Sequence, residues 1–589
     1  MPTISVRYKD LMNLLGEKLD DEQVDQLLFD YGLELDQITC ENETISNISN
    51  IKDEEKIYKI ETPANRFDLL SVEGLAAALS YFMGKPTDRH IVLKKEKMSV
   101  IQVDSSVESI RPFVVGAIMR NVVFNPENYK SFIDLQDKLH SSIGRNRSIV
   151  SMGTHDLDTI QGPFVYKALP PSQIIFKPLN ASQKYSADEL IELYSKNSHL
   201  KPYLNIIKNF DKYPVILDAN GVVCSMPPII NGEHSKLSIE TKNIFIEITA
   251  TDEHRANVAL NSLVTAFSCY LEKKFQVDAI SIEYDERTEI SPNLSYRQEK
   301  LHVNLVNSRI GINETQPSMI RHLNRMGFNV KPFDENTLLV SVPPNRSDIL
   351  HWYDLCEDVA ISYGYNNIIK KMPSTNAITT VIYMNDISDK LRAEIAYYGY
   401  NEALTFSLYS KSDVFYKRDD LPSSVTSKEC LDCVCILNPK TTECQMVRKS
   451  LIPGLLKTLS ANQIYILPLK LFEVSDVVLM DLSNSNKASN QRNIAAVYMS
   501  TESSFQVIHG LLDKILNFLG LYNKTDYVLE KDETNIAYFS PRCAKIKLLK
   551  SNAIIGSIGI IHPKTIKNYE IPYIVSAFEF NLQMLLKYL

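Results

Sequence analysis

Several features are scarce in this sequence, and each scarcity excludes a class of protein. Glycine accounts for only 19 of 589 residues, which excludes collagen-like and other low-complexity chains. No run of about 18 apolar residues occurs, so no membrane-spanning helix is expected. The first residues, Met1 to Arg7, lack the apolar stretch of a secretory signal. Together with only nine cysteines, these features predict a reducing, cytoplasmic location and no membrane partner.

Net positive charge is also missing. The 63 lysines and arginines are outnumbered by 71 aspartates and glutamates, which gives a formal charge of −8. The overall charge therefore gives no support for nucleic-acid binding, and a contact with RNA would require a local basic patch. The length exceeds what one hydrophobic core usually serves, and it predicts roughly three to five domains.

Four of the nine cysteines gather in one short stretch. Cys430 and Cys433 have the CxxC spacing of zinc sites, and Cys435 and Cys444 follow them. No second CxxC pair and no nearby pair of histidines completes a zinc-binding set, and the apolar residues between the cysteines indicate a strand. We therefore interpret the stretch as reduced thiols in a strand and a loop.

The chain contains an internal repeat. The pattern Pro-x-Asn-Arg-x-Asp occurs at 63–68 and again at 343–348, and each copy precedes a helical pattern that ends near Gly84 or Gly364. Upstream of both motifs, apolar residues recur at helical spacing between a pair of glycines. The sequence therefore predicts two copies of a small α+β unit of roughly eighty residues.

Local physical chemistry explains much of the repeated motif. Asp68 and Asp348 come just before a helical pattern, where a carboxylate can cap free N–H groups. The proline ends the preceding strand, and Asn-Arg forms the turn. The first copy also carries an additional polar stretch, around Glu41 to Lys56, which predicts a loop.

The second copy has carboxylates that the first copy lacks. Asp354, Glu357 and Asp358 fall at i, i+3 and i+4 of the predicted helix, whereas the first copy has glycine or alanine at these positions. The same fold is therefore not expected to need these acids, and adjacent carboxylates repel each other unless a cation is near. A Mg²⁺ ion, a basic partner surface and a solvated acidic helix face are all compatible with this spacing.

These residues resemble the signature of phenylalanyl-tRNA synthetase β subunits. The resemblance includes the motif at 344–348, the acidic stretch at 354–360 and Tyr-Gly-Tyr-Asn-Asn at 363–367. In that family the corresponding carboxylates form a Mg²⁺ site shared with the α subunit. The resemblance therefore implies four magnesium ligands here: Asp348, Asp354, Glu357 and Asp358. The last is Asp where bacterial members carry Glu, which is a mild departure.

The resemblance extends along the whole chain and implies a multidomain α+β fold. Four domains are expected, and the chain is similar to the shorter archaeal and eukaryotic cytosolic type because it has no room for the additional bacterial domains. The four domains expected in this chain are a repeat unit with a DNA-binding-like fold at 1–88, a mixed tRNA-editing domain at 89–288, a second repeat unit with the acidic site at 295–372, and a degenerate class II synthetase domain with an antiparallel sheet at 375–589.

The middle segment resembles the proofreading domain of archaeal and eukaryotic β subunits. Residues 215–223 predict a hairpin with an Asn-Gly turn, and residues 244–248 predict a strand. A proofreading pocket must accept tyrosine and exclude phenylalanine, and buried polar groups that phenylalanine leaves unpaired supply that exclusion. The predicted editing residues are Ser225, Glu233, His234, Glu247, Thr249, Asp252 and His155. Each histidine taken singly fits an ordinary loop position better than catalysis, and the ribose hydroxyl of the RNA could itself assist hydrolysis.

The C-terminal third resembles a class II synthetase core without its ATP chemistry. Strand-like runs alternate with helices, which predicts an antiparallel sheet with flanking helices. Arg448 is followed by Lys449-Ser450 instead of the Arg-x-Glu of such cores, and no arginine follows Gly559 to compensate a γ-phosphate. No ATP site is therefore expected in this chain, and Arg448 is expected to stabilise the fold or contact the α subunit.

The leading hypothesis is a β subunit of an α2β2 phenylalanine–tRNA ligase. In such a complex the α subunit would join phenylalanine to tRNA(Phe) with ATP and Mg²⁺, and this chain would scaffold that site and hydrolyse mischarged Tyr-tRNA(Phe). An alternative is a non-enzymatic RNA- or protein-binding scaffold, although the polar residues of the middle segment argue against it. A third is a free-standing aminoacyl-tRNA hydrolase, against which the long C-terminal domain argues.

Overall fold

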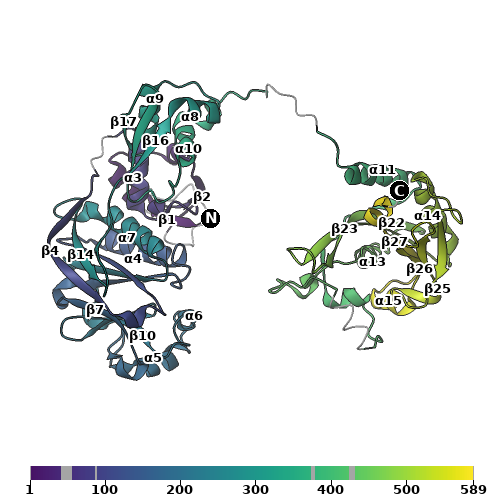
Figure 1. The fold of residues 1–589 in the computed structure, drawn as a ribbon, viewed down its shortest axis with the longest axis horizontal. Coiled ribbons are helices and arrows are strands. Elements are labelled where there is room, and N and C mark those ends of the chain that lie inside the picture. Colours follow the sequence, from purple (N-terminus) through teal and green to yellow (C-terminus); the bar gives the residue numbers. More distant parts are fainter. Residues whose placement is uncertain (1, 41–55, 86–88, 373–378, 423–431, 588–589) are drawn as a thin grey trace. The chain divides into compact units, whose positions relative to one another are not determined.

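The structure, a computed structural model, describes residues 2–40, 56–85, 89–372, 379–422 and 432–587. The chain forms two compact α+β units, Met1–Met372 and Pro373–Leu589, each with its own cores (Figure 1). No helix in the described ranges is long and apolar enough to cross a membrane.

The two repeated segments fold alike. The first contains β1 (Thr3–Arg7), α1 (Tyr8–Leu15), α2 (Asp21–Tyr31), β2 (Glu34–Cys40), β3 (Lys56–Glu61) and α3 (Val72–Phe82). The second contains β16 (Arg297–His302), α8 (Val303–Ile310), α9 (Gln316–Arg325), β17 (Asn329–Pro332), β18 (Thr337–Val342) and α10 (Trp352–Tyr363). Their antiparallel sheets have matching orders, β1-β3-β2 and β16-β18-β17, so the last strand of each segment lies in the centre.

The middle of the first unit is built on one large sheet. Its strands are β4 (Val92–Val103), β5 (Phe113–Met119), β6 (Val150–Asp156), β7 (Phe164–Leu169), β10 (Tyr213–Leu217), β11 (Val223–Met226), β12 (Ile230–Asn231), β13 (Ile244–Ala250), β14 (Gln276–Glu283) and β15 (Thr288–Ser291). The order is β12-β11-β10-β7-β4-β14-β5-β13-β6, with β15 beside β14. The predicted hairpin at 215–223 and the predicted strand at 244–248 are confirmed as β10–β11 and β13.

The large sheet curls so that its two ends meet. Ser225 on β11 bonds Glu247 on β13, and the side-chain amide of Asn231 on β12 reaches the backbone oxygen of Thr154 on β6 at 3.5 Å. These contacts join strands from opposite ends of the order, so one face of the sheet becomes an interior. Around the sheet lie α4 (Pro126–Ser141), α5 (Ala187–Tyr194), α6 (Lys201–Leu204), α7 (Glu253–Phe267) and the short pair β8 (Ile175–Phe176) and β9 (Tyr185–Ser186).

The second unit contains a mainly antiparallel sheet with a core on each face. Its order is β19 (Asn401–Glu402), β22 (Leu469–Met480), β23 (Ala488–Ser500), β27 (Ile574–Asn581), β26 (Ile554–Ile561), β25 (Tyr538–Leu548) and β24 (Tyr527–Lys531), with only β19 and β22 parallel among the pairs described. The core of one face includes α11 (Tyr383–Tyr397), α14 (Phe505–Phe518) and α16 (Leu582–Lys587). The other core includes α13 (Ile452–Ala461), and α15 (Pro563–Asn568) and the pair β20 (Leu408–Tyr409) and β21 (Met446–Val447) complete the unit.

One local prediction needs correction, and another falls almost entirely outside the described residues. The helix after each motif is capped by Ser71 or His351, not by Asp68 or Asp348, because each aspartate faces the arginine two residues before it. The predicted loop around Glu41 to Lys56 lies outside the described residues except for Lys56, which begins β3.

The cysteine stretch shows no metal-binding arrangement in its described part. Cys430 lies outside that part, and the sulfurs of Cys435 and Met446 lie 3.4 Å apart. Cys433 is buried and Cys444 is half-buried, and no group of three or more potential ligands gathers among the described residues. The predicted strand is not confirmed, because in the described part of the stretch Cys435 makes only an isolated bridge with Met446, and Cys444 ends a short 3₁₀ turn.

Candidate functional site

A cluster of polar side chains lies buried in the interior of the curled sheet. The hydroxyl of Ser225 donates a hydrogen bond to Oε1 of Glu247 at 2.7 Å. Nδ1 of His155 lies 2.8 Å from the hydroxyl of Ser235, and its Nε2 lies 3.8 Å from Oε1 of Glu247. All four residues are at most 1% exposed, so their interactions form in a medium of low polarity.

Strand pairing brings this cluster together. In the antiparallel register of β13 and β6, Glu247 lies opposite Gly153, and Phe245 lies opposite His155. A side chain at position 153 would collide with the cluster, since a Cβ there would lie 2.1 Å from Oε1 of Glu247. The glycine therefore provides the space that the carboxylate occupies.

Thr249 extends the cluster toward a buried arginine. It lies two residues from Glu247 and so on the same face of β13. Nε of Arg111 donates to its hydroxyl at 3.3 Å, and Nη2 donates to its backbone oxygen at 2.8 Å. Burial lowers the pKa of Arg111, an effect that nearby Tyr166 and Glu247 oppose. The sequence analysis missed this arginine, since nothing around it indicates a partner more than a hundred residues away.

Two polar atoms of the cluster are unpaired. Among the described residues, Nε2 of His155 and Oε2 of Glu247 have no hydrogen-bond partner although both are buried. An unpaired buried polar atom costs about 1–3 kcal/mol. A small hydroxyl group between these two residues could donate to the carboxylate and accept from the imidazole, so the cluster is suited to recognise a hydroxyl group.

Three of the predicted editing residues lie outside the cluster. Oε2 of Glu233 accepts the backbone N–H of Asn180, and His234 is exposed. Asp252 caps α7 by accepting the backbone N–H of Arg255 at 3.1 Å. These residues are neighbours of the cluster in sequence, but their side chains serve the surrounding loops and a helix end.

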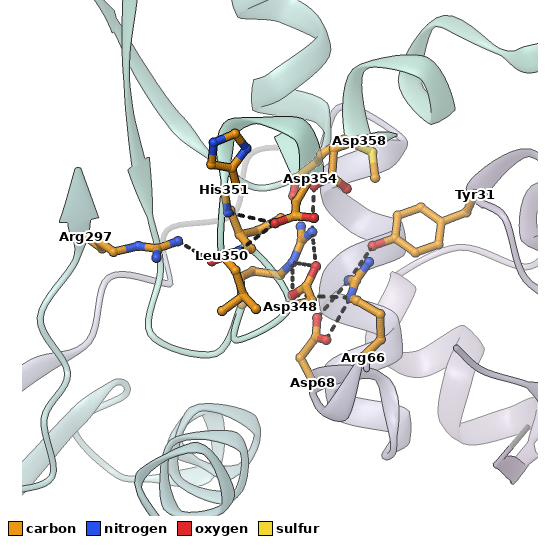
Figure 2. Close-up of polar contacts among 12 residues, drawn as sticks. Tyr31, Arg66, Asp68, Arg297, Asp348, Leu350, His351, Asp354 and Asp358 are labelled. Atoms are coloured by element: carbon orange, nitrogen blue, oxygen red, sulfur yellow. Dashed lines mark hydrogen bonds and ion pairs between the residues drawn. The ribbon is translucent and has the colours of Figure 1, made fainter. Parts of the chain in front are cut away.

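Two acidic residues of the second repeat, labelled Asp348 and Asp358 in Figure 2, contact a buried arginine. Arg346 donates to both oxygens of Asp348 at 2.9 and 2.7 Å, and its Nη2 donates to Asp358 at 2.6 Å. Asp354 instead accepts the backbone N–H groups of Leu350 and His351 at 2.7 and 2.8 Å, at the start of α10.

The first repeat forms a related arrangement. Arg66 donates to both oxygens of Asp68 at 2.9 and 2.8 Å and to the hydroxyl of Tyr31 at 2.9 Å. Figure 2 shows this arginine beside Asp348 of the other repeat, and its Nε lies 4.0 Å from the Asp348 carboxylate. The two repeats therefore meet through a shared network of buried arginines and aspartates.

The four predicted magnesium ligands do not fit a metal ion as this chain holds them. No group of three or more potential ligands converges within the described residues, and Glu357 is exposed on the helix surface. Burial raises the pKa of Asp358 to about 6 although Arg346 opposes this. Burial acts in the same direction on Asp348, but Arg346 and Arg66 outweigh it and lower the pKa of that carboxyl. Arginine therefore supplies the positive charge that a cation would supply.

Arg448 of the second unit is held by contacts within its own chain. Its Nη1 lies 2.7 Å from Oε1 of buried Glu473, and its Nε donates to the backbone oxygen of Asp476 at 3.0 Å. A guanidinium held in this way stabilises the sheet of the unit.

Comparison with known proteins places these features in a family. Family models match in succession the Phe-tRNA synthetase beta subunit B1 domain at residues 1–85, the B3/4 domain at 117–291, the tRNA synthetase B5 domain at 299–365 and the phenylalanyl tRNA synthetase beta chain CLM domain at 368–582. The phenylalanine–tRNA ligase beta subunit of Caenorhabditis elegans is 45% identical over 99% of this chain and 100% of its own length. The chain belongs to the phenylalanine–tRNA ligase beta subunit family.

Further relatives of this family extend the comparison. The human protein of this name is 42% identical over 99% of both chains, and the Saccharomyces cerevisiae protein is 37% identical over the full length of both. A solved N-terminal fragment of the phenylalanyl-tRNA synthetase beta subunit from Pyrococcus horikoshii is 27% identical with a TM-score of 0.56, and it covers 62% of this chain and 99% of the fragment. The family predicted from the motifs is therefore confirmed.

Proposed function

We propose that this chain hydrolyses mischarged Tyr-tRNA(Phe) at the buried polar cluster, while a partner α subunit attaches phenylalanine to tRNA(Phe) with ATP. The observation that carries the proposal is the pair of unpaired atoms, Nε2 of His155 and Oε2 of Glu247. A tyrosine hydroxyl could pair both atoms. Phenylalanine would fill the same space and leave both atoms unpaired, which costs about 1–3 kcal/mol for each group.

The cluster is better suited to recognising the hydroxyl group of the substrate than to hydrolysing its ester. Glu247 is already bonded to Ser225, and His155 contacts Ser235, so these groups have fixed positions. Fixed polar groups discriminate well because they cannot turn toward another partner when the hydroxyl is missing. Hydrolysis itself can use water assisted by the neighbouring ribose hydroxyl of the RNA.

Exposed apolar side chains in the second unit support the proposal that a partner subunit binds this chain. Phe406 is 92% exposed, and other loop residues of the same unit are similarly uncovered: Leu404, Leu437, Ile464, Ile466 and Leu482. A contiguous patch of such side chains is typical of a surface that another chain covers. An α subunit in an α2β2 complex would be that chain.

A Mg²⁺ ion bound by Asp348, Asp354, Glu357 and Asp358 stays a prediction from the family resemblance. Since Arg346 occupies two of these carboxylates, such a site would need ligands from the α subunit or a rearrangement on assembly. Titration of Mn²⁺ as a paramagnetic probe, with the isolated chain and with the complex, tests this directly. Binding by the complex alone supports a shared site, and no binding by either form contradicts it.

The editing proposal is tested with the α–β complex and two substrates, Tyr-tRNA(Phe) and Phe-tRNA(Phe). We expect the wild-type complex to deacylate only the tyrosyl ester. Glu247→Gln should slow this reaction about 10- to 100-fold, the equivalent of one lost charged hydrogen bond, without changing aminoacylation. Glu240→Gln, on the exposed surface, is the matched control and should behave as wild type.

Two results would count against the proposal. Deacylation of both esters at equal rates would show that the cluster does not select the hydroxyl. No deacylation by a complex that aminoacylates normally would favour the alternative, a scaffold without editing activity.

A further inference from the structure

The two repeats pack against each other about an approximate two-fold axis. Helix α2 of the first repeat packs on α10 of the second, and α9 of the second packs on α3 of the first. A Cβ at Gly32 would lie 3.8 Å from Cδ1 of Ile361, and a Cβ at the equivalent Gly327 would lie 3.2 Å from the ring of Tyr81. Ile361 and Tyr81 occupy the same position in α10 and α3, so the two sides of the interface can be compared directly.

A cavity of about 270 Å³ lies on one side of this interface. Three residues with small side chains line it from α3, namely Gly74, Ala77 and Ala78. The equivalent positions of α10 carry the carboxylates Asp354, Glu357 and Asp358. The opposite wall belongs to the second repeat and includes residues 326–329 and 343–346. The first repeat therefore has open space where the second repeat has acidic side chains.

Arg66 lines the cavity and has one nitrogen without a partner. Its Nε and Nη2 donate to Asp68, and Nη2 also donates to the hydroxyl of Tyr31. Nη1 makes no hydrogen bond with any described residue, yet it is not one of the enclosed unpaired atoms, so it keeps surface that a ligand can reach. Because the whole residue is only 7% exposed and belongs to the lining, this nitrogen opens into the cavity.

The equivalent arginine of the second repeat shows what such a nitrogen can bind. All three nitrogens of Arg346 donate hydrogen bonds, with Nη2 to Asp358 at 2.6 Å and Nη1 to the backbone oxygen of Met326 at 3.3 Å. Ala78 stands at the position equivalent to Asp358 and offers no such group. A carboxylate bound in the cavity could meet Arg66 as the side chain of Asp358 meets Arg346, and hydrogen bonds between these two charged groups are strong.

A second cation lines the same cavity. Arg89 is half-buried, and its guanidinium lies 6.0 Å from the ring centroid of Phe275 but makes no hydrogen bond or ion pair with the described residues. Asp68 is the only carboxylate among the described lining residues, and Arg66 binds both of its oxygens. The positive charge of Arg89 is therefore left unbalanced within the described lining, which favours an anionic ligand.

We propose that this cavity binds a small organic carboxylate, held by Nη1 of Arg66 and by Arg89. Apolar groups of Ala77, Ala78 and Phe328 line the same space and suit the carbon chain of such an acid. The volume lies just below the usual range of small-molecule sites, so the ligand is a compact acid. Inorganic phosphate presents similar oxygens and is the competing ligand. The proposal is independent of the editing function, and a ligand between the two repeats would stabilise their interface.

The test measures binding of succinate to the full chain in complex with its α subunit, by saturation-transfer difference NMR. We expect saturable binding by the wild type. Ala78→Asp gives the first repeat the carboxylate that Asp358 gives the second, so it should weaken succinate binding at least about tenfold. Arg89→Gln removes one cation and should weaken binding about tenfold. Ala219→Asp, in the exposed turn between β10 and β11, makes the same chemical change as Ala78→Asp and should bind like the wild type.

Three results would overturn the carboxylate site. The first is no succinate signal with the wild type, and the second is equal binding by the wild type and Ala78→Asp. The third comes from titrating inorganic phosphate as a competitor, since phosphate that binds about tenfold more tightly than succinate would assign the site to a phosphate group. Aminoacylation by the Ala78→Asp complex shows that this variant is folded. If it is not, Arg89→Gln decides alone, and unchanged succinate binding by that variant would overturn the site.

Discussion

The substitution Asp358→Ala separates a structural ion-pair network from a metal site in the acidic cluster. In the present structure it would remove one of two carboxylates that hold Arg346, whose side chain is 4% exposed. In a magnesium site it would remove one ligand of a cation instead. The neighbouring Glu357 is exposed, so Glu357→Ala is a matched control at which the two interpretations differ.

The structure gives the size of the expected effect. Breaking a buried ion pair typically costs about 3–5 kcal/mol because the remaining charge stays buried. Both oxygens of Asp348 still accept hydrogen bonds from Arg346, so we expect the lower end, about 3 kcal/mol. For a unit of this size that corresponds to a melting temperature lower by roughly 5 °C. Glu357→Ala should change the stability by less than about 0.5 kcal/mol.

Differential scanning calorimetry measures the melting temperatures of the two variants, each with Mg²⁺ and with EDTA. The comparison distinguishes the ion-pair network from the metal site. The ion-pair interpretation predicts a large effect of Asp358→Ala that is the same in both solutions, and almost none of Glu357→Ala. The reasoning is refuted if both variants lower the melting temperature equally in Mg²⁺ and neither does so in EDTA, since that pattern belongs to ligands of a bound ion.

Three further changes test other parts of the structure. Gly153→Ala places a methyl group against Glu247, so we expect at least about tenfold slower deacylation of Tyr-tRNA(Phe) with aminoacylation intact; Gly162→Ala, whose methyl group would only touch the Phe164 ring, is the control. Gly510→Ala adds a methyl group in open space within α14 and should stabilise the second unit by about 0.5–1 kcal/mol, as measured by calorimetry. Burial raises the pKa of Glu579, so the folded state binds more protons than the unfolded state, and stability is lost as the pH rises through the folded pKa. Glu579→Gln can keep hydrogen bonds to Ser450, Leu451 and Asn493, so its unfolding temperature should depend less on pH between 4 and 7 than that of the wild type; equal slopes would contradict this.

Sequence periodicity was sufficient to predict local helices and strands of this chain. It did not predict which residues its buried polar side chains contact. Apolar spacing predicted the helices between paired glycines, which the structure places at α2 and α9, and the Asn-Gly turn predicted the hairpin of β10 and β11. The strand predicted at 244–248 contains Glu247, and the structure extends it to Ala250, so that Thr249 shares the face of Glu247. Arg111 and Gly153 reach this face only through long-range strand pairing, for which the local sequence has no signal.

The repeat itself shows why the ion pair of Asp358 was not predicted. Since alanine stands at position 78 where the second copy has Asp358, the fold was expected not to need that carboxylate. Both copies, however, bury an arginine that needs a further partner beyond its motif aspartate. The first copy supplies the hydroxyl of Tyr31 from α2, and the second supplies Asp358 from α10. Comparing two copies position by position misses such a substitution, because the same requirement is met from different elements of the unit.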